Sequence, residues 1–122
     1  MSSPSTQNGA PIAFKIVDAA EWAGAEVAGA YPGSAVDRAD GYIHLSTEAQ
    51  LAETAAKHYA GRGGLLLLTV DLGRLGETVV WEPSRGGSLF PHIYGPLPVG
   101  AVSGCRAFNV TPDGTMVFGD GA

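Results

Sequence analysis

The chain has 122 residues, of which 45% are apolar and 16% are charged, and its formal net charge is −5. This length is sufficient for one domain with a buried core, and the composition is typical of globular proteins. The seven Lys and Arg residues are scattered singly along the sequence, which argues against a nucleic-acid-binding face. The longest apolar run, residues 65–68, is far too short to cross a bilayer. We therefore expect a cytoplasmic protein with neither a nucleic-acid nor a membrane partner.

Polar residues without hydrophobic periodicity make up the N-terminus. We expect residues 1–11 to form a disordered tail rather than a signal peptide, and residues 12–120 to form a single domain. Cys105 is the only cysteine, so no intrachain disulfide can form, and its strand-like surroundings predict a small buried hydrophobe. The histidines, at positions 44, 58 and 92, lack the close pairing of common zinc motifs, so no metal ion is expected.

The first elements predicted are a strand, a helix and a loop. Residues 13–17 alternate in polarity and include β-branched side chains, which indicates a strand. Asp18 then offers an N-cap with Glu21 as its capping-box partner, and the helix that begins there is expected to end near Gly29. A polar loop follows and ends in the Asp40-Gly41 turn.

A short strand and a well-defined helix are predicted next. Residues 42–46 form the strand, Thr47 caps the helix, Gln50 occupies the capping-box position, and a glycine at position 61 or 63 ends it. The apolar stripe of this helix fits the 3.6-residue period and consists of Leu51, Ala52, Ala55, Ala56 and Tyr59.

The second half of the chain is predicted to be mainly strands. They are expected over residues 64–72 and 77–82, then near residues 102–110 and 115–118, with a Gly/Pro-rich segment in the middle. The first of these is apolar enough to be buried on both faces. The order of elements predicts an α+β fold in which two early helices pack against a strongly bent or split, antiparallel-rich sheet.

The first of two polar stretches, residues 40–47, contains a candidate binding wall. Alternation along a strand places Tyr42, His44 and Ser46 on one face, opposite two aliphatic residues that face the core. A solvated strand face is the simpler interpretation of a lone His-Ser pair. The second polar stretch, residues 81–98, favours a cleft instead.

That second stretch supplies a carboxylate at the end of a strand. Glu82 directly precedes Pro83, so it lies where the strand ends and is a candidate general base or cation stabiliser. The alternative is a surface carboxylate paired with Arg85. Arg85, in a glycine-containing loop, could instead hold one phosphate or carboxylate.

Proline rigidifies the remainder of this stretch. Three prolines lie within residues 90–98 and hold His92 and Tyr94 in place, and the competing interpretation is a rigid corner with Tyr94 in the core. His58 lies away from the apolar stripe of its helix, which predicts a surface position. The rings of Trp22 and Trp81 are expected in the core.

These motifs resemble a known family. The sequences Asp40-Gly-Tyr-Ile-His-Leu-Ser-Thr47 with Gln50, Trp81-Glu-Pro-Ser-Arg-Gly-Gly87 and Phe90-Pro-His-Ile-Tyr-Gly-Pro-Leu-Pro98 resemble a small, mainly bacterial domain-of-unknown-function family, number nine-five-two. The resemblance extends from about Phe14 to Phe108. It implies an ADP-ribosyltransferase-like fold, in which a split β-sheet clamps a nicotinamide dinucleotide.

The resemblance also implies roles for particular residues. His44 would hold a ribose hydroxyl, as does a histidine on an early strand of the histidine-tyrosine-glutamate enzymes. Glu82 would contact the second ribose and support an oxocarbenium-like transition state, and Tyr94 or Tyr42 would stack on nicotinamide. In those enzymes the stacking tyrosine precedes the glutamate, whereas Tyr94 follows Glu82 here.

Three functions remain open at this point. The first is an enzyme that uses NAD as substrate for glycosyl transfer or hydrolysis, with His44 and Glu82 as catalytic residues. Its ligand-binding residues would be Tyr42, Ser46, Arg85, His92 and Tyr94. The second is a non-catalytic module that binds a nucleotide or small anion in the same cleft. The third is a protein-interaction domain that uses the corner at residues 90–98.

Overall fold

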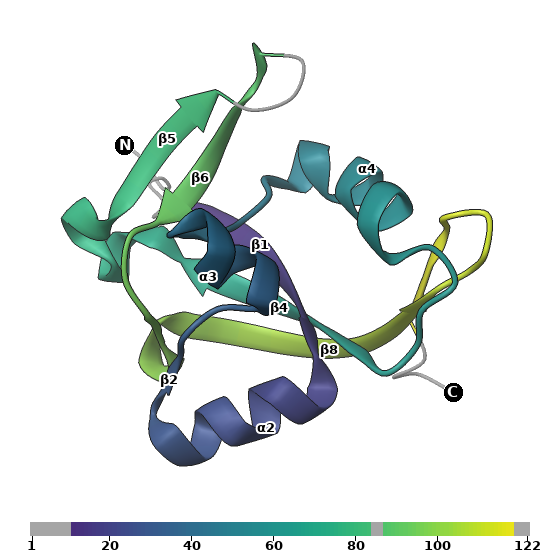
Figure 1. Ribbon diagram of the computed structural model, residues 1–122, viewed down its shortest axis with the longest axis horizontal. Helices are drawn as coiled ribbons and strands as arrows, with labels where there is room; N and C mark the ends of the chain where they lie inside the picture. The colour runs from purple at the N-terminus through teal and green to yellow at the C-terminus, as the bar shows by residue number, and fades with distance from the viewer. Residues whose placement is uncertain (1–10, 84–86, 119–122) are drawn as a thin grey trace, which may run out of the picture.

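Three α-helices and three separate antiparallel sheets make up the described part of the chain (Figure 1). The computed structural model describes residues 11–83 and 87–118. Arg85 and nearly all of the expected N-terminal tail therefore lie outside the described residues. The fold is α+β, as the order of elements predicts, but with one helix more than the two expected.

The largest sheet has the strand order β1-β4-β8-β9, formed by Ile12–Asp18, Leu65–Asp71, Val102–Val110 and Met116–Phe118. A second sheet pairs β2 (Ala30–Tyr31) with β7 (Leu97–Pro98), and a third has the order β3-β6-β5, formed by Ile43–His44, Leu89–Ile93 and Val79–Pro83. The helices are α2 (Ala19–Ala28), α3 (Ala35–Asp40) and α4 (Glu48–Tyr59), and single 3-10 turns lie at Leu72–Arg74, Gly76–Thr78 and Val99–Ala101. None of the described helices is long and apolar enough to cross a membrane.

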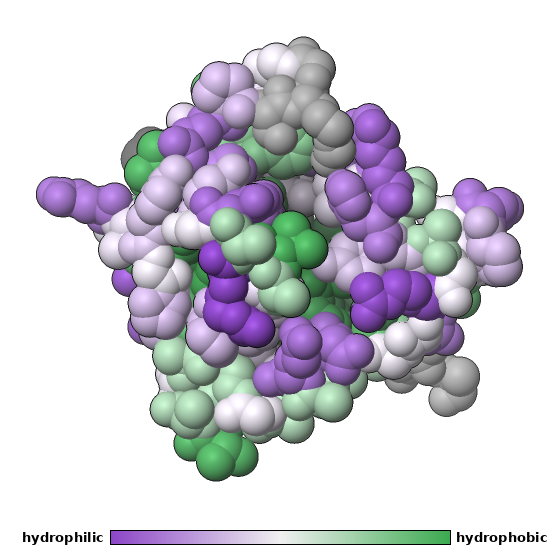
Figure 2. Space-filling view, in the orientation of Figure 1, coloured by the Kyte–Doolittle hydropathy of each residue, from purple (hydrophilic) through white to green (hydrophobic). Residues whose placement is uncertain are grey.

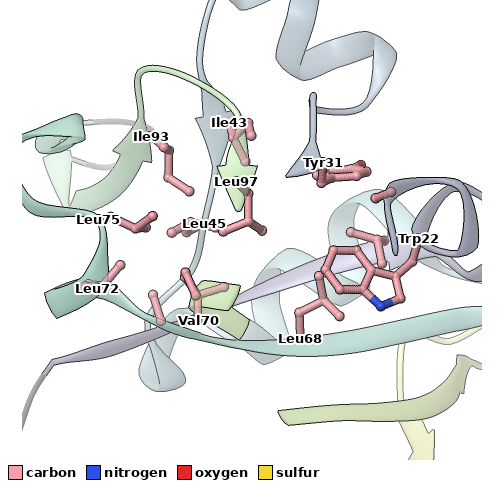
Figure 3. Packing of buried hydrophobic residues seen from close by; sticks show 14 residues of the cluster. Trp22, Tyr31, Ile43, Leu45, Leu68, Val70, Leu72, Leu75, Ile93 and Leu97 are labelled. Atoms are coloured by element: carbon pink, nitrogen blue, oxygen red, sulfur yellow. The ribbon is translucent and has the colours of Figure 1, made fainter. Parts of the chain in front are cut away.

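The core lies on both faces of β4, which explains the continuous apolar sequence of this strand. Leu68 and Val70 pack into one cluster with Trp22 of α2 (Figure 3). Leu65 and Leu67 belong to a second cluster that includes buried residues of α4. Helices α2 and α4 therefore cover opposite faces of the four-stranded sheet, and β1 forms one of its edges.

Residues 43–46 link the three-stranded sheet to this edge. His44 pairs with His92 on β6, whereas Ser46 forms an isolated bridge with Phe14 on β1. In that bridge the Phe14 N–H donates to the Ser46 carbonyl at 2.7 Å, and the Ser46 N–H donates to the Phe14 carbonyl at 2.9 Å. The crossing brings the histidines of one sheet next to the edge strand of the other.

Local capping signals are confirmed for two helices. Asp18 caps α2 by accepting a hydrogen bond from the Ala20 N–H, and Gly29 ends the helix in the left-handed region with φ 93°. Glu21 does not complete the expected capping box, and its carboxylate accepts a hydrogen bond from the Tyr31 hydroxyl instead. Thr47 and Gln50 form the predicted capping box of α4. The helix ends at Tyr59, before the glycines expected to stop it. Trp22 is buried as predicted.

Two segments expected to be irregular are regular instead. Residues 35–40, predicted as loop, form α3, because Ser34 and Asp37 make a complete capping box. Residues 89–93, predicted as part of a Pro-rich corner, form β6 and occupy the centre of the three-stranded sheet. Pro91 and Pro96, whose isomeric state the sequence leaves open, both follow trans peptide bonds.

Two expected core residues are exposed. Trp81 lies on the edge strand β5 with 44% of its surface accessible, although its cross-strand partner Pro91 is buried. Cys105 lies in β8 as expected but is exposed rather than buried. Both residues lie in strands, as expected, but at positions where the side chain stays accessible. Residues 77–78, expected to begin a strand, belong to a 3-10 turn instead.

Candidate functional site

A pocket of about 730 Å³ lies beside β1 and is lined from α3, α4, β1 and β6. Figure 2 shows the molecule hollowed between α3 and α4, with hydrophilic residues around the hollow and apolar surface inside it. A volume of this size is within the range of about 300–1,000 Å³ that is typical of small-molecule sites. The pocket is therefore large enough for a nucleotide-sized ligand.

A buried carboxylate supports one wall of the pocket. Asp37 is only 2% exposed, and its carboxylate lies 2.9 Å from the Nζ atom of Lys15, which is itself buried on β1. The Ser34 N–H also donates to this carboxylate, at 2.9 Å. Because a buried charge is tolerated only when it is paired and hydrogen-bonded, each of these groups depends on the others.

The same carboxylate fixes His44 in two ways. The His44 backbone N–H donates to Asp37 Oδ1 at 3.1 Å, and the ring Nδ1 lies 2.5 Å from the same oxygen. On the other side of the ring, Nε2 lies 3.0 Å from Asp40 Oδ2. A carboxylate can only accept hydrogen bonds, so both contacts are satisfied when the ring carries two protons. His44 is thus clamped between two carboxylates.

The ionisation of this group follows from its surroundings. Burial alone would raise the pKa of Asp37, but the hydrogen bond from the His44 ring, the charge of Lys15 and the Ser34 N–H outweigh it and hold the pKa well below its usual value. Burial lowers the pKa of Lys15, although Asp37 opposes that change. Both pKa values are lowered, and this is consistent, because Asp37 accepts hydrogen bonds from several donors whereas Lys15 has a single carboxylate partner at hydrogen-bond distance.

A second histidine–carboxylate pair lies on the three-stranded sheet. His92 is 4% exposed, and its Nδ1 lies 2.7 Å from Glu82 Oε1. The Tyr94 hydroxyl is 2.9 and 3.0 Å from the two oxygens of the same carboxylate. The register explains this arrangement: Val80 pairs with His92, so Glu82 lies diagonally opposite on the same face, and Tyr94 follows two residues later on that face.

Glu82 is held as a carboxylate by these neighbours. The hydrogen bonds from His92 and then Tyr94 lower its pKa from the usual value, and its accessible position adds little opposition. The same contact raises the pKa of the Tyr94 hydroxyl, because ionisation would place two negative charges side by side. Near neutral pH, the Tyr94 hydroxyl therefore donates a hydrogen bond to the Glu82 carboxylate.

An aromatic side chain joins the two histidines. The Tyr42 ring stacks on His92 with centroids 4.1 Å apart and an interplanar angle of 24°. It also lies 4.8 Å from the ring of His44. The two imidazole rings themselves are 5.4 Å apart, edge to face. The site thus presents two oriented imidazoles side by side, each held through Nδ1 by its own carboxylate.

The residues singled out in the sequence fall into three groups. Tyr42, His44, Ser46 and His92 all line the pocket. Glu82 and Tyr94 do not line it, so the expected cleft between His44 and Glu82 is replaced by one whose walls are His44 and His92. The reason is the register of β5 and β6, which puts His92 in front of Glu82. Arg85 lies outside the described residues.

Sequence reasoning missed two charged members of the site. Lys15 stands on an otherwise apolar strand, and such a lysine is a sign of a buried partner. Asp37 follows Ser34 at the spacing of a capping box, which was visible in the sequence. The sequence does not predict the contact between Lys15 and Asp37, because the two residues are 22 positions apart.

A guanidinium group also lines the pocket. The Arg62 guanidinium lies 5.1 Å above the Tyr59 ring and 3.8 Å from Asp18, and it is half exposed. His58 is exposed as predicted and also lines the pocket. No three His, Cys, Asp or Glu residues in the described ranges are placed to hold a metal ion.

The sequence matches the family model described as Protein of unknown function (DUF952) over residues 16–105. The crystal structure of Protein CC0527 from Caulobacter crescentus is 46% identical, with a TM-score of 0.84 over 91% of this chain and 97% of that chain. The solution structure of CC0527 is 48% identical, with a TM-score of 0.74 over 84% of this chain and 89% of that chain. No curated protein matches the sequence. Since the family model spans well over half of the sequence, the chain belongs to the DUF952 family.

Proposed function

We propose that this protein binds a nucleotide-like small molecule of the NAD class in the pocket and catalyses transfer or hydrolysis at its glycosidic carbon. The observation that carries the proposal is the pair of imidazoles, 5.4 Å apart, each anchored by a carboxylate at one wall of the pocket. Oriented imidazoles beside a ligand-sized pocket are a common means of moving protons in an active site.

The rest of the pocket supports a nucleotide ligand. Among the lining residues, Arg62 supplies a cation for a phosphate, and the carboxylate of Asp40 is an acceptor for ribose hydroxyls. We further propose that the fold is ADP-ribosyltransferase-like. The support for this is that separate antiparallel sheets of four and three strands meet beside one pocket.

The experiment is a ligand panel on the full chain with NAD, ADP-ribose, nicotinamide and phosphorylated ribosides. We expect NAD to raise the melting temperature and to shift the amide signals of His44, Ser46 and His92. Nicotinamide release, followed by chromatography, then measures turnover. If none of these compounds shifts the pocket amides, the proposal is refuted.

A non-catalytic binding module is the second candidate, and one contact favours it. Both ring nitrogens of His44 already face carboxylates, so neither is directed at a ligand in the pocket. Saturable NAD binding without nicotinamide release would support the module. The substitution Glu82→Gln separates the two, because it should leave affinity nearly unchanged in both cases and reduce turnover only in an enzyme.

The third candidate, a protein-interaction corner at residues 90–98, has less support. Such a surface needs an exposed apolar patch. Ile93 and Leu97 are fully buried, and Phe90 is partly buried and lines the pocket. The apolar residues of this segment therefore contribute to the core and the pocket wall.

A further inference from the structure

We infer that His92 is the catalytic base of this pocket, acting through Nε2, and that Glu82 is a positioning residue that fixes its tautomer. The inference rests on the proposed function for its substrate, a nucleotide with a glycosidic bond to nicotinamide. It moves the role of general base from Glu82, for which the position at a strand end makes it a candidate, to the histidine in front of it.

The position of the His92 ring carries the argument. Nδ1 points at Glu82, which does not line the pocket, whereas His92 is one of the residues that line it. The two nitrogens of an imidazole point in widely different directions, so Nε2 is directed away from Glu82. No hydrogen bond from Nε2 to any described residue is present. A buried polar atom in this state, on a side chain that lines a pocket, is available to a ligand or a water molecule.

His44 is unsuited to the same role. Its Nδ1 and Nε2 are each within hydrogen-bond distance of a carboxylate, Asp37 on one side and Asp40 on the other. A ring held in this way has no free lone pair with which to accept a proton. The two imidazoles are therefore different: His44 is a donor fixed in place, and His92 has one nitrogen without a partner among the described residues.

Glu82 selects the useful tautomer of His92. As a carboxylate it accepts only, so the proton of the neutral His92 ring must be on Nδ1, and the lone pair is then on Nε2. The Tyr94 hydroxyl holds both oxygens of Glu82 and keeps it aimed at Nδ1. Stacking against Tyr42 fixes the plane of the ring. A carboxylate that orients a histidine base in this manner is a common arrangement in hydrolytic enzymes.

The chemical step follows from this geometry. A water molecule hydrogen-bonded to Nε2 attacks C1′ of the ribose, and the new C–O bond forms as the bond from C1′ to the pyridinium nitrogen breaks. The electron pair of the broken bond goes to that nitrogen, which leaves as neutral nicotinamide. His92 takes the proton of the water and later releases it to solvent. Each turnover consumes one water and yields ADP-ribose, nicotinamide and one proton; with an acceptor hydroxyl in place of water, the same balance gives transfer.

The first test is the tautomer of His92, read from long-range ¹H–¹⁵N NMR spectra of the uniformly labelled full chain. His92→Asn assigns the signal. In the spectrum of the neutral ring, we expect Nδ1 to be protonated and Nε2 to carry the lone pair. Glu82→Ala should mix the tautomers. Glu77→Gln is the matched control, since this exposed carboxylate lies in the preceding 3-10 turn and should have no effect.

The second test is turnover of NAD. His92→Asn should reduce nicotinamide release by about 10²–10⁴-fold, the usual contribution of a general base, with little change in NAD affinity. Added imidazole should restore part of the rate in His92→Gly. Glu82→Ala should reduce the rate of nicotinamide release by less, in proportion to the fraction of His92 rings that carry the proton on Nε2.

These results separate the two proposals. A neutral His92 ring with the proton on Nε2, or full turnover in His92→Asn, overturns the assignment of the base whether or not NAD is the best substrate. If no nucleotide in the panel binds while the Nδ1–H tautomer is found and depends on Glu82, the proposed function fails and the assignment of the free nitrogen is supported.

Discussion

The substitution Asp37→Asn tests the structural basis of the site, because this carboxylate holds three separate segments together. It accepts hydrogen bonds from Ser34, from His44 and from the ammonium group of Lys15 on β1. Asparagine has nearly the same shape but no charge, and its amide nitrogen adds a donor where only acceptors are useful. The variant leaves the Lys15 ammonium buried without a counter-charge.

The expected loss of stability is large. Breaking a buried ion pair by neutralising one partner costs about 3–5 kcal/mol, because the remaining charge is left in a poorly solvated place. A typical domain has only about 5–15 kcal/mol of unfolding free energy. We therefore expect Asp37→Asn to be near the limit of folding at 37 °C, which urea unfolding at a lower temperature can measure.

Asp40→Asn is the matched control. Asp40 lies three residues later on the same helix and contacts the same histidine, but its side chain is 47% exposed. An exposed pair of this kind is worth about 0–1 kcal/mol. The double variant Lys15→Met with Asp37→Asn removes the stranded ammonium and should be more stable than Asp37→Asn alone. Equal losses for Asp37→Asn and Asp40→Asn, or no recovery in the double variant, would refute the reasoning.

The pH dependence of the Asp37 effect has a defined sign. The folded state holds the pKa of Asp37 below its unfolded value, so its carboxylate contributes stability that is fully present above about pH 4, the usual range of aspartate. That contribution is lost as the pH falls further, towards the folded pKa. The difference in unfolding free energy between the wild type and Asp37→Asn should be constant from neutral pH down to that range and then shrink.

Two further predictions concern other parts of the chain. Gly114→Ala should lower the unfolding free energy by about 1–3 kcal/mol in urea unfolding, since its φ is +92° and the new Cβ would lie 2.8 Å from Ala56 Cβ. Gly64→Ala is the control, because its φ is +68° but nothing lies near the new Cβ, so only the backbone cost remains. Equal losses in the two variants would contradict the steric argument. Tyr94→Phe should raise the pKa of Glu82 by removing a hydrogen bond to its carboxylate, which a carboxyl ¹³C NMR titration can measure; an unchanged midpoint would disprove it.

The parts of the fold that the sequence predicts are those with local causes. The capping box at Thr47 and the apolar run of β4 lie within one element each and were read correctly. Helix α3 has only six residues, too few to show a period, so its signal was limited to Ser34 and Asp37. The sequence does not predict strand β6, because Pro91 within it is more typical of a chain corner than of a central strand.

The site was predictable only where it depends on alternation along one strand. That rule placed Tyr42, His44 and Ser46 together, and all three line the pocket. The partner of His44 could not be predicted, because Asp37 comes from a helix that was read as loop. The relation between Glu82 and His92 depends on the register of two strands, which the sequence does not specify here.

Pro91 connects these observations, because it limits how far β3 can follow the central strand. The Leu45 N–H donates to the Pro91 carbonyl at 3.1 Å, but proline has no N–H with which to return the bond. The ladder between β3 and β6 therefore contains only two residue pairs. Beyond this point the chain leaves β6 and runs along the edge of β1, where the backbone of Ser46 is hydrogen-bonded to that of Phe14. Pro91 thus favours the chain path from the three-stranded sheet to β1, which brings both His44 and Lys15 to the carboxylate of Asp37.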